Sequence, residues 1–111
     1  MKDDRLHLLY IIEAIDKILQ YTKEGRDAFI ANPMAQDAVI RNFEIIGEAV
    51  KQLSAEVKKK NPKIPWKRIA GFRDVLIHDY MMVELEEVWN VVSHHLADLG
   101  REINSIVNQY K

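Results

Sequence analysis

The sequence predicts an all-α protein, an antiparallel up-and-down bundle of four to five helices in which residues 1–111 form a single domain. Glycine and proline are scarce, with four and three residues in 111. Apolar residues recur at steps of three and four over long stretches, which is the spacing of one helix face. No stretch alternates apolar and polar residues in the manner of a half-buried strand. A chain of this length can bury one hydrophobic core without metals or disulfides.

The first helix is expected from about Asp3 to Thr22, with Asp3 and Asp4 near its positive end. Its apolar stripe consists of Leu8, Ile12, Ile15, Leu19 and Thr22. Ile11 and Ile18 widen this stripe, so the helix is expected to pack against more than one neighbour.

The second helix is expected to begin at Asn32-Pro33, a good N-cap and first-turn pair, and to end at Asn61-Pro62. Its stripe steps by four and three through Val39, Phe43, Ile46, Val50, Leu53 and Val57. Gly47 lies inside this pattern and Gly71 inside the next one. Because glycine costs about 1 kcal/mol relative to alanine within a helix, both positions suggest a close approach of two helices.

A shorter third helix is expected from Pro65 in its first turn. It continues through Trp66, Ile69, Phe72 and Leu76. The last helix starts near Glu84, and its apolar residues keep a seven-residue repeat, which is typical of a bundle helix. These residues are Leu85, Trp89, Val92, Leu96, Leu99, Ile103, Ile106 and Tyr110. Four apolar residues lie outside the main seams and fit either extra core or a homodimer surface: Ile11, Ile45, Val88 and Val107.

The composition excludes several classes of protein. The absence of cysteine excludes disulfides and thiolate-zinc sites. No apolar run is long enough to cross a bilayer, and the first ten residues do not resemble a signal sequence, so we expect a cytoplasmic protein without membrane contact. The net charge of -1 does not suit a protein that coats nucleic acid.

Basic residues are nevertheless concentrated between positions 58 and 70, where no acidic residue occurs. They are Lys58, Lys59, Lys60, Lys63, Lys67 and Arg68. A local positive field of this kind can attract phosphate backbones, which makes the segment a candidate RNA-binding surface. A solvated basic connector between helices explains the same composition, and both interpretations remain open.

The stretch R-D-V-L-I-H-D-Y brings Arg73, His78 and Tyr80 together at the end of the third helix. Histidine exchanges protons near neutral pH, and arginine grips phosphate with two donors. Cleavage of RNA needs a base for the 2′-hydroxyl, an acid for the leaving 5′-oxygen and a cation for the charge on the phosphate. Arg73 and His78 could supply the acid and the cation without a metal or a cofactor.

Helix geometry complicates this hypothesis, because residues five apart lie roughly 140° apart around a helix. Either the helix ends near His78, or a second protomer completes the site in a two-fold dimer. Asp74 lies four residues before His78 and could orient the imidazole, although an ordinary surface ion pair fits this spacing equally well.

Other candidate sites are weaker. His94 and His95 are adjacent and point in different directions, so they are expected to be surface residues. Glu44 and Glu48 share a face but have no histidine at a matching offset, so no metal site is expected there.

Three blocks of the chain resemble the HepT-like branch of the HEPN domains. They are R-N-F-E-I-I-G-E-A (residues 41–49), I-P-W-K-R-I-A-G-F-R-D-V-L-I-H-D-Y (residues 64–80) and V-W-N-V-V (residues 88–92). The likeness covers nearly the whole chain. HEPN domains are helical bundles that commonly dimerise, and their signature is an arginine, a polar residue, three variable positions and a histidine. Arg73, Asp74 and His78 match this signature.

The resemblance implies a metal-independent endoribonuclease toxin of a type VII-like toxin/antitoxin system, which cleaves RNA at a cleft between two protomers. It implies Arg73 and His78 as the catalytic pair and Asp74 as their support. The usual partner is a minimal nucleotidyltransferase antitoxin of the MntA type, which transfers AMP to the tyrosine two positions after the histidine, here Tyr80. The alternative is a non-catalytic helical subunit that binds a nucleotide or regulates a nucleotidyltransferase.

Overall fold

The computed structural model describes residues 3–110, except for the side chain of Tyr80. This part of the chain contains helices and no strands. The elements in order are α1 (Asp4–Tyr21), α2 (Arg26–Ile30), α3 (Pro33–Gln52), α4 (Ala55–Lys60), α5 (Trp66–His78), the 3₁₀ helix η1 (Tyr80–Met82), α6 (Leu85–His94) and α7 (Leu96–Asn108). The predicted all-α class is confirmed.

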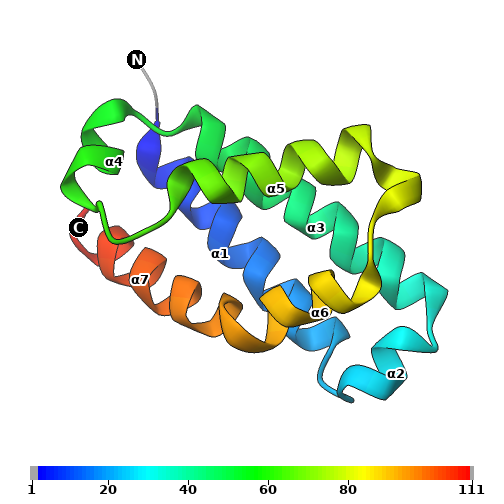
Figure 1. Cartoon of the computed structure of the whole chain (residues 1–111). Coiled ribbons are helices and arrows are strands. Elements are labelled where there is room, and N and C mark those ends of the chain that lie inside the picture. Colours follow the sequence, from blue (N-terminus) through cyan, green and yellow to red (C-terminus); the bar gives the residue numbers. More distant parts are fainter. Residues whose placement is uncertain (1–2, 111) are drawn as a thin grey trace.

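The long helices lie alongside one another and alternate in direction (Figure 1). α1 packs against α3 and α7, and α3 packs in turn against α5. The short helix α4 lies at one end of this bundle, and α2 lies at the other, where it packs against α3 and α6. α6 and α7 together occupy the place of the single last helix that the heptad pattern predicts, so the bundle has the expected up-and-down arrangement.

Buried apolar residues from every α-helix form the core. The whole predicted stripe of the second helix is buried. In α1 the stripe is centred differently from the prediction, because Ile11 and Ile18 are fully buried whereas Leu19 is 38% exposed. Val88 of α6 is fully buried as well. Ile11 and Val88 are therefore core residues rather than surface for a partner.

The helix predicted from Asn32 to Asn61 is in fact two helices, α3 and α4, separated at Leu53 and Ser54. Ser54 caps α4, because its hydroxyl accepts a hydrogen bond of 3.2 Å from the backbone N–H of Val57. The carboxylate of Asp4 in α1 accepts two further bonds, from the Ser54 N–H at 2.8 Å and its hydroxyl at 2.6 Å. These contacts stabilise the break, since a serine bonded in this way competes with the continuous helix.

The predicted last helix is also broken, at His95, where α6 ends and α7 begins. The side chains of Ser93 and His94 lie 3.4 and 3.2 Å from the carbonyl oxygen of Asn90. They compete with the backbone for this acceptor, and competition of this kind is a common cause of local distortion. The heptad pattern could not reveal the break, because the apolar spacing continues through it.

Helix α2 was not predicted. It follows Gly25, whose φ of 97° requires glycine, and it buries Phe29 in the core. Arg26 forms an ion pair with Glu86 that joins α2 to α6.

The predicted helix starts are accurate to within one residue. Asp3 caps α1 by accepting from Leu6 N–H at 3.1 Å, and Asn32 caps α3 by accepting from Ala35 N–H at 3.1 Å. Pro65 lies one position before α5 instead of in its first turn. Among the described residues, no helix is long and apolar enough to cross a membrane.

Candidate active site

The close packing of α5 on α3 sets the position of Arg73. A methyl group at Gly47 of α3 would lie 2.2 Å from the Cβ atom of Arg73 and 2.8 Å from its Cγ atom. The aliphatic stem of Arg73 therefore passes directly over Gly47, as the glycine suggested. The same prediction is wrong for Gly71, which is exposed and would have no neighbour within 4 Å of an added Cβ atom.

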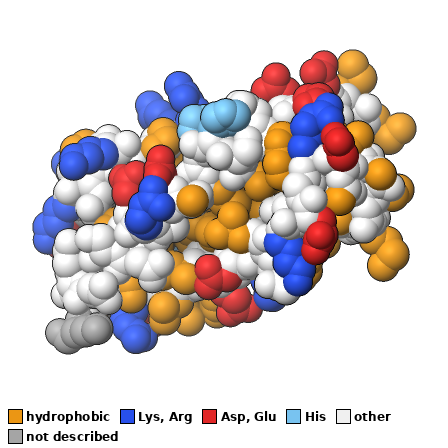
Figure 2. Space-filling model, turned by 90° about the horizontal axis from the view of Figure 1, so that it is seen from below, with side chains coloured by type: hydrophobic (Ala, Val, Ile, Leu, Met, Phe, Trp, Pro, Cys, Tyr) orange, Lys and Arg blue, Asp and Glu red, His pale blue; other side chains and the backbone are white. Residues whose placement is uncertain are grey.

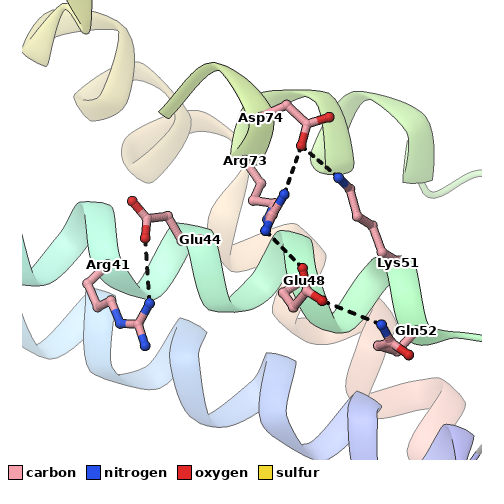
Figure 3. Close-up of polar contacts among 7 residues, drawn as sticks. All are labelled: Arg41, Glu44, Glu48, Lys51, Gln52, Arg73 and Asp74. Atoms are coloured by element: carbon pink, nitrogen blue, oxygen red, sulfur yellow. Dashed lines mark hydrogen bonds and ion pairs between the residues drawn. The ribbon is translucent and has the colours of Figure 1, made fainter. Parts of the chain in front are cut away.

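Two carboxylates hold the guanidinium group of Arg73 (Figure 3). Its Nη2 atom lies 3.0 Å from Oε2 of Glu48 in α3, and its Nη1 atom lies 3.0 Å from Oδ1 of Asp74. The Nζ atom of Lys51 donates to the same Oδ1 atom of Asp74 at 2.6 Å. Two cations and two anions thus form one chain of contacts that crosses from α3 to α5.

The pKa of the Asp74 carboxyl is lowered, first by the hydrogen bond from Lys51 and second by the bond from Arg73. Asp74 is therefore ionised at neutral pH and acts as a counter-ion to Arg73. Within the described part of the chain, no hydrogen bond or ion pair joins Asp74 to His78. In this structure the carboxylate pairs with the arginine of the motif and with Lys51.

His78 is the last residue of α5 and is exposed to solvent. The expectation that the helix ends near this histidine is confirmed. The next residue, Asp79, caps the helix, and Tyr80 begins η1. The side chain of Tyr80, the predicted site of modification, lies outside the part of the chain that the structure describes.

A surface pocket of about 290 Å³ lies beside Arg73, between α1, α3 and α5. Its lining includes Arg73 and Ile77 of α5 but not His78. The other lining residues are His7, Tyr10, Arg41, Glu44, Ile45, Glu48, Ala49 and Gln52.

Polar groups that the sequence analysis did not connect with the motif face this pocket. The rings of His7 and Tyr10 meet edge to face with centroids 5.9 Å apart, and Arg41 lies 3.6 Å from Glu44. These residues belong to α1 and α3, and no spacing along one helix links them to Arg73. The only usable signal in the sequence was Gly47, which marks where α3 meets α5.

The six predicted RNA-binding residues lie at the other end of α5 and in the segment before it. Lys58, Lys59 and Lys60 form the last turn of α4, and Lys60 pairs with Glu56 at 3.0 Å. Lys63 lies in the connector, and Lys67 and Arg68 lie in the first turn of α5. All but Lys58 are exposed. At about 1.5 Å per residue, the side chain of Lys67 starts roughly 16 Å from that of His78 along the helix.

Charges of both signs are mixed on the face of the molecule drawn in Figure 2, where they surround a central group of hydrophobic side chains. His94 and His95 are exposed, as predicted. Over residues 3–110 the structure has no group of three or more histidine and carboxylate side chains that could hold a metal ion.

An all-α bundle with an arginine and a histidine five residues apart at the end of one helix defines a protein of the HEPN class. A family model described as "Ribonuclease HepT-like" matches residues 11–106. This chain belongs to the HepT-like family of ribonucleases, and the family that the motif suggested is confirmed.

Two relatives of similar length support this assignment. The chain is 35% identical over 112 residues to "Putative RNase TTE0752" of Caldanaerobacter subterraneus subsp. tengcongensis, and the match covers 100% of both proteins. It is 40% identical over 90 residues to "Probable ribonuclease HepT" of Thermococcus cleftensis, with 80% of this chain and 82% of that protein covered.

The chain also matches about half of a longer relative. "Gamma-glutamylcyclotransferase and putative RNase MJ0434" of Methanocaldococcus jannaschii is 43% identical over 109 residues, which are 97% of this chain. The chain spans 49% of the length of that relative. No solved structure matches the chain.

Proposed function

We propose that this chain is a metal-independent endoribonuclease toxin of a type VII-like toxin/antitoxin system. It cleaves RNA in a cleft between two copies of the chain and is neutralised when an MntA-type nucleotidyltransferase adds AMP to Tyr80. The observation that carries the proposal is the position of Arg73 and His78 on one helix, with the guanidinium beside a surface pocket and the imidazole at the exposed helix end.

In the proposed reaction, the 2′-oxygen of the RNA attacks the adjacent phosphorus. A bond forms from phosphorus to the 2′-oxygen, and the bond from phosphorus to the 5′-oxygen breaks. A base takes the proton of the 2′-hydroxyl, an acid gives a proton to the leaving 5′-oxygen, and Arg73 stabilises the charge on the phosphate. The products carry a 2′,3′-cyclic phosphate and a 5′-hydroxyl.

One histidine cannot act as base and acid in the same step, so a second copy of the chain supplies the second His78. An exposed apolar area beside the pocket supports such a dimer. Leu6 and Tyr10 of α1 are 40% and 45% exposed, and Ile77 of α5 is 39% exposed. A two-fold axis near this area would bring the two α5 helix ends to one cleft.

The basic segment from Lys58 to Arg68 would hold the RNA strand at a distance from the scissile phosphate. Lys67 and Arg68 add their charge to the positive N-terminal end of α5, and Lys63 is exposed next to them. Phosphate contacts of this kind supply affinity without reading the sequence. Salt should therefore weaken RNA binding strongly.

The proposed modification has a simple electrostatic effect. An AMP group on Tyr80 would add a bulky anion two residues after His78. Like charges repel, and the group would occupy the space that RNA needs.

The cleavage proposal is tested with purified protein that carries no AMP group. In the presence of a chelator, the wild-type protein and an Arg101→Gln variant should cut RNA, because Arg101 is exposed on α7 away from the pocket. His78→Ala should bind the RNA without cutting it. Equal cleavage by the wild type and His78→Ala would overturn the proposal. RNA left intact by a wild-type protein that binds nucleotide or the transferase would instead favour the non-catalytic alternative.

The neutralisation proposal is tested by intact mass. Protein produced together with an MntA-type transferase should gain one or more AMP increments, and Tyr80→Phe should gain none. An unchanged mass of the wild type, or increments that persist in Tyr80→Phe, would exclude Tyr80 as the modified residue.

A further inference from the structure

Glu48 forms an ion pair with the partly buried Arg73, although its own side chain is largely exposed. Its side chain is 51% exposed, yet one carboxylate oxygen lies 3.0 Å from Nη2 of Arg73, whose side chain is only 23% exposed. The other oxygen accepts a hydrogen bond of 3.4 Å from Nε2 of Gln52, one turn further along α3 (Figure 3). Both oxygens of this carboxylate are therefore engaged, and its orientation relative to α3 is restricted.

The donors of Arg73 are only partly used. A guanidinium group has five N–H donors. Nη1 donates one of them to Asp74, and Nη2 lies 3.0 Å from Oε2 of Glu48 in an ion pair, while the buried Nε finds no partner among the described residues. The remaining hydrogens on the two terminal nitrogens are free to grip two oxygens of a phosphate. The two carboxylates thus hold the group without saturating it.

The two contacts also restrict rotation. Because the acceptors bind different terminal nitrogens from two helices, a turn of the guanidinium plane would break at least one ion pair. The close packing at Gly47 also restricts the movement of the aliphatic stem of Arg73, since this stem lies against the α3 backbone at that point.

We propose that Glu48 is a positioning residue for Arg73, which fixes the guanidinium plane in the orientation that binds the scissile phosphate. This inference rests on the proposed function. Glu48 does not touch the RNA. It acts through Arg73, so that little reorganisation is needed when charge develops on the phosphate.

A simple counter-ion would behave differently from a positioning residue. Glu48→Gln removes a negative charge beside a phosphate site, so a mere counter-ion would, when removed, improve RNA binding and leave kcat unchanged. Loss of positioning would instead lower kcat, because a misplaced catalytic group can cost up to about 100-fold in rate.

The test compares kcat and KM of the wild type with those of Glu48→Gln, in the presence of a chelator. We expect kcat to fall about tenfold or more while KM stays the same or decreases. Glu13→Gln is the matched control, because it removes one negative charge from an exposed pair with Lys17 on α1 and should keep the wild-type kcat. A wild-type kcat in Glu48→Gln would overturn the inference.

A second measurement does not depend on activity. In the nuclear magnetic resonance spectrum, the terminal nitrogens of the Arg73 guanidinium should rotate slowly in the wild type and faster in Glu48→Gln. If the wild type leaves RNA intact but these signals respond to the substitution, the proposed function is wrong and the hold of Glu48 on Arg73 stands. Equal rotation rates in both proteins would show that Glu48 does not restrict the Arg73 guanidinium, and would overturn the inference.

Discussion

The position of the Arg73 side chain depends on residues of two helices, α3 and α5. Its stem needs the bare backbone at Gly47, and its charge needs Glu48 and Asp74. Lys51 then stabilises Asp74, so that no anion of this group is left without a cation. Exposed ion pairs contribute little to stability one by one. Their effect here is on geometry, because they orient a partly buried guanidinium group.

Acid should weaken the contribution of Asp74 to folding. Its pKa is lowered in the folded protein by Lys51 and Arg73, so its stabilising effect is complete above the usual carboxyl pKa of about 4 and is lost as the pH falls through the lowered value. We expect Asp74→Asn to be less stable than the wild type at pH 7, and the difference to shrink below about pH 4. Urea unfolding of both proteins at several pH values measures it. A difference that is constant from pH 7 to pH 2.5 would contradict this account.

At the residue scale, the sequence predicted the motif but not its surroundings. The order of residues along one helix is enough to indicate Arg73, Asp74 and His78. The partners Glu48 and Lys51 come from another helix, and pairing across helices depends on a register that one sequence does not reveal. For Asp74, the spacing fitted an orienting contact with His78 and an ordinary surface ion pair equally well, and in the structure Asp74 forms ion pairs with Lys51 and Arg73.

Helix α3 is the central helix of the candidate site. It packs against α1 on one side and α5 on the other, and the pocket beside Arg73 lies where these three helices meet. The existence and the apolar faces of α1, α3 and α5 could be predicted, because long amphipathic patterns are strong signals. The breaks at Ser54 and His95 could not, since they depend on side-chain contacts such as that between Ser54 and Asp4.

Two glycine substitutions should have opposite effects on stability. Gly71→Ala adds a methyl group in open space on α5 and should stabilise the protein by about 1 kcal/mol. Gly47→Ala places a methyl group 2.2 Å from the Cβ atom of Arg73, and overpacking of this kind costs about 1–3 kcal/mol. Thermal unfolding of the two variants measures both effects. Equal stabilisation by both would mean that α3 and α5 are further apart than described.

For the molecule as a whole, each chain supplies a single His78, at the end of α5, whereas the proposed reaction needs two proton transfers. In the proposed dimer, the second copy would cover the exposed apolar residues beside the pocket. From the sequence, Ile11 and Val88 fitted either extra core or a dimer surface, and both are core. The exposed candidates are instead Leu6, Tyr10 and Ile77.

Disruption of the proposed dimer should abolish cleavage without unfolding the chain. Leu6→Glu places a charge on the proposed interface at an exposed position, so we expect a monomer with little activity. Met34→Glu is the matched control, because Met34 is 82% exposed at the start of α3 and does not line the pocket. Sedimentation and RNA cleavage measure the two effects. A Leu6→Glu protein that remains dimeric would exclude this face, and an active monomer would exclude the shared site.

In the proposed reaction, Arg73 and His78 cleave RNA through its own 2′-hydroxyl, without a metal ion. The most direct measurement is the chemistry of the product ends after digestion in a chelator. We expect a 2′,3′-cyclic phosphate and a 5′-hydroxyl on the fragments, and no cleavage of a substrate whose 2′-hydroxyl at the cut position is replaced by hydrogen. Products with a 5′-phosphate, or cleavage of the deoxy substrate, would contradict it.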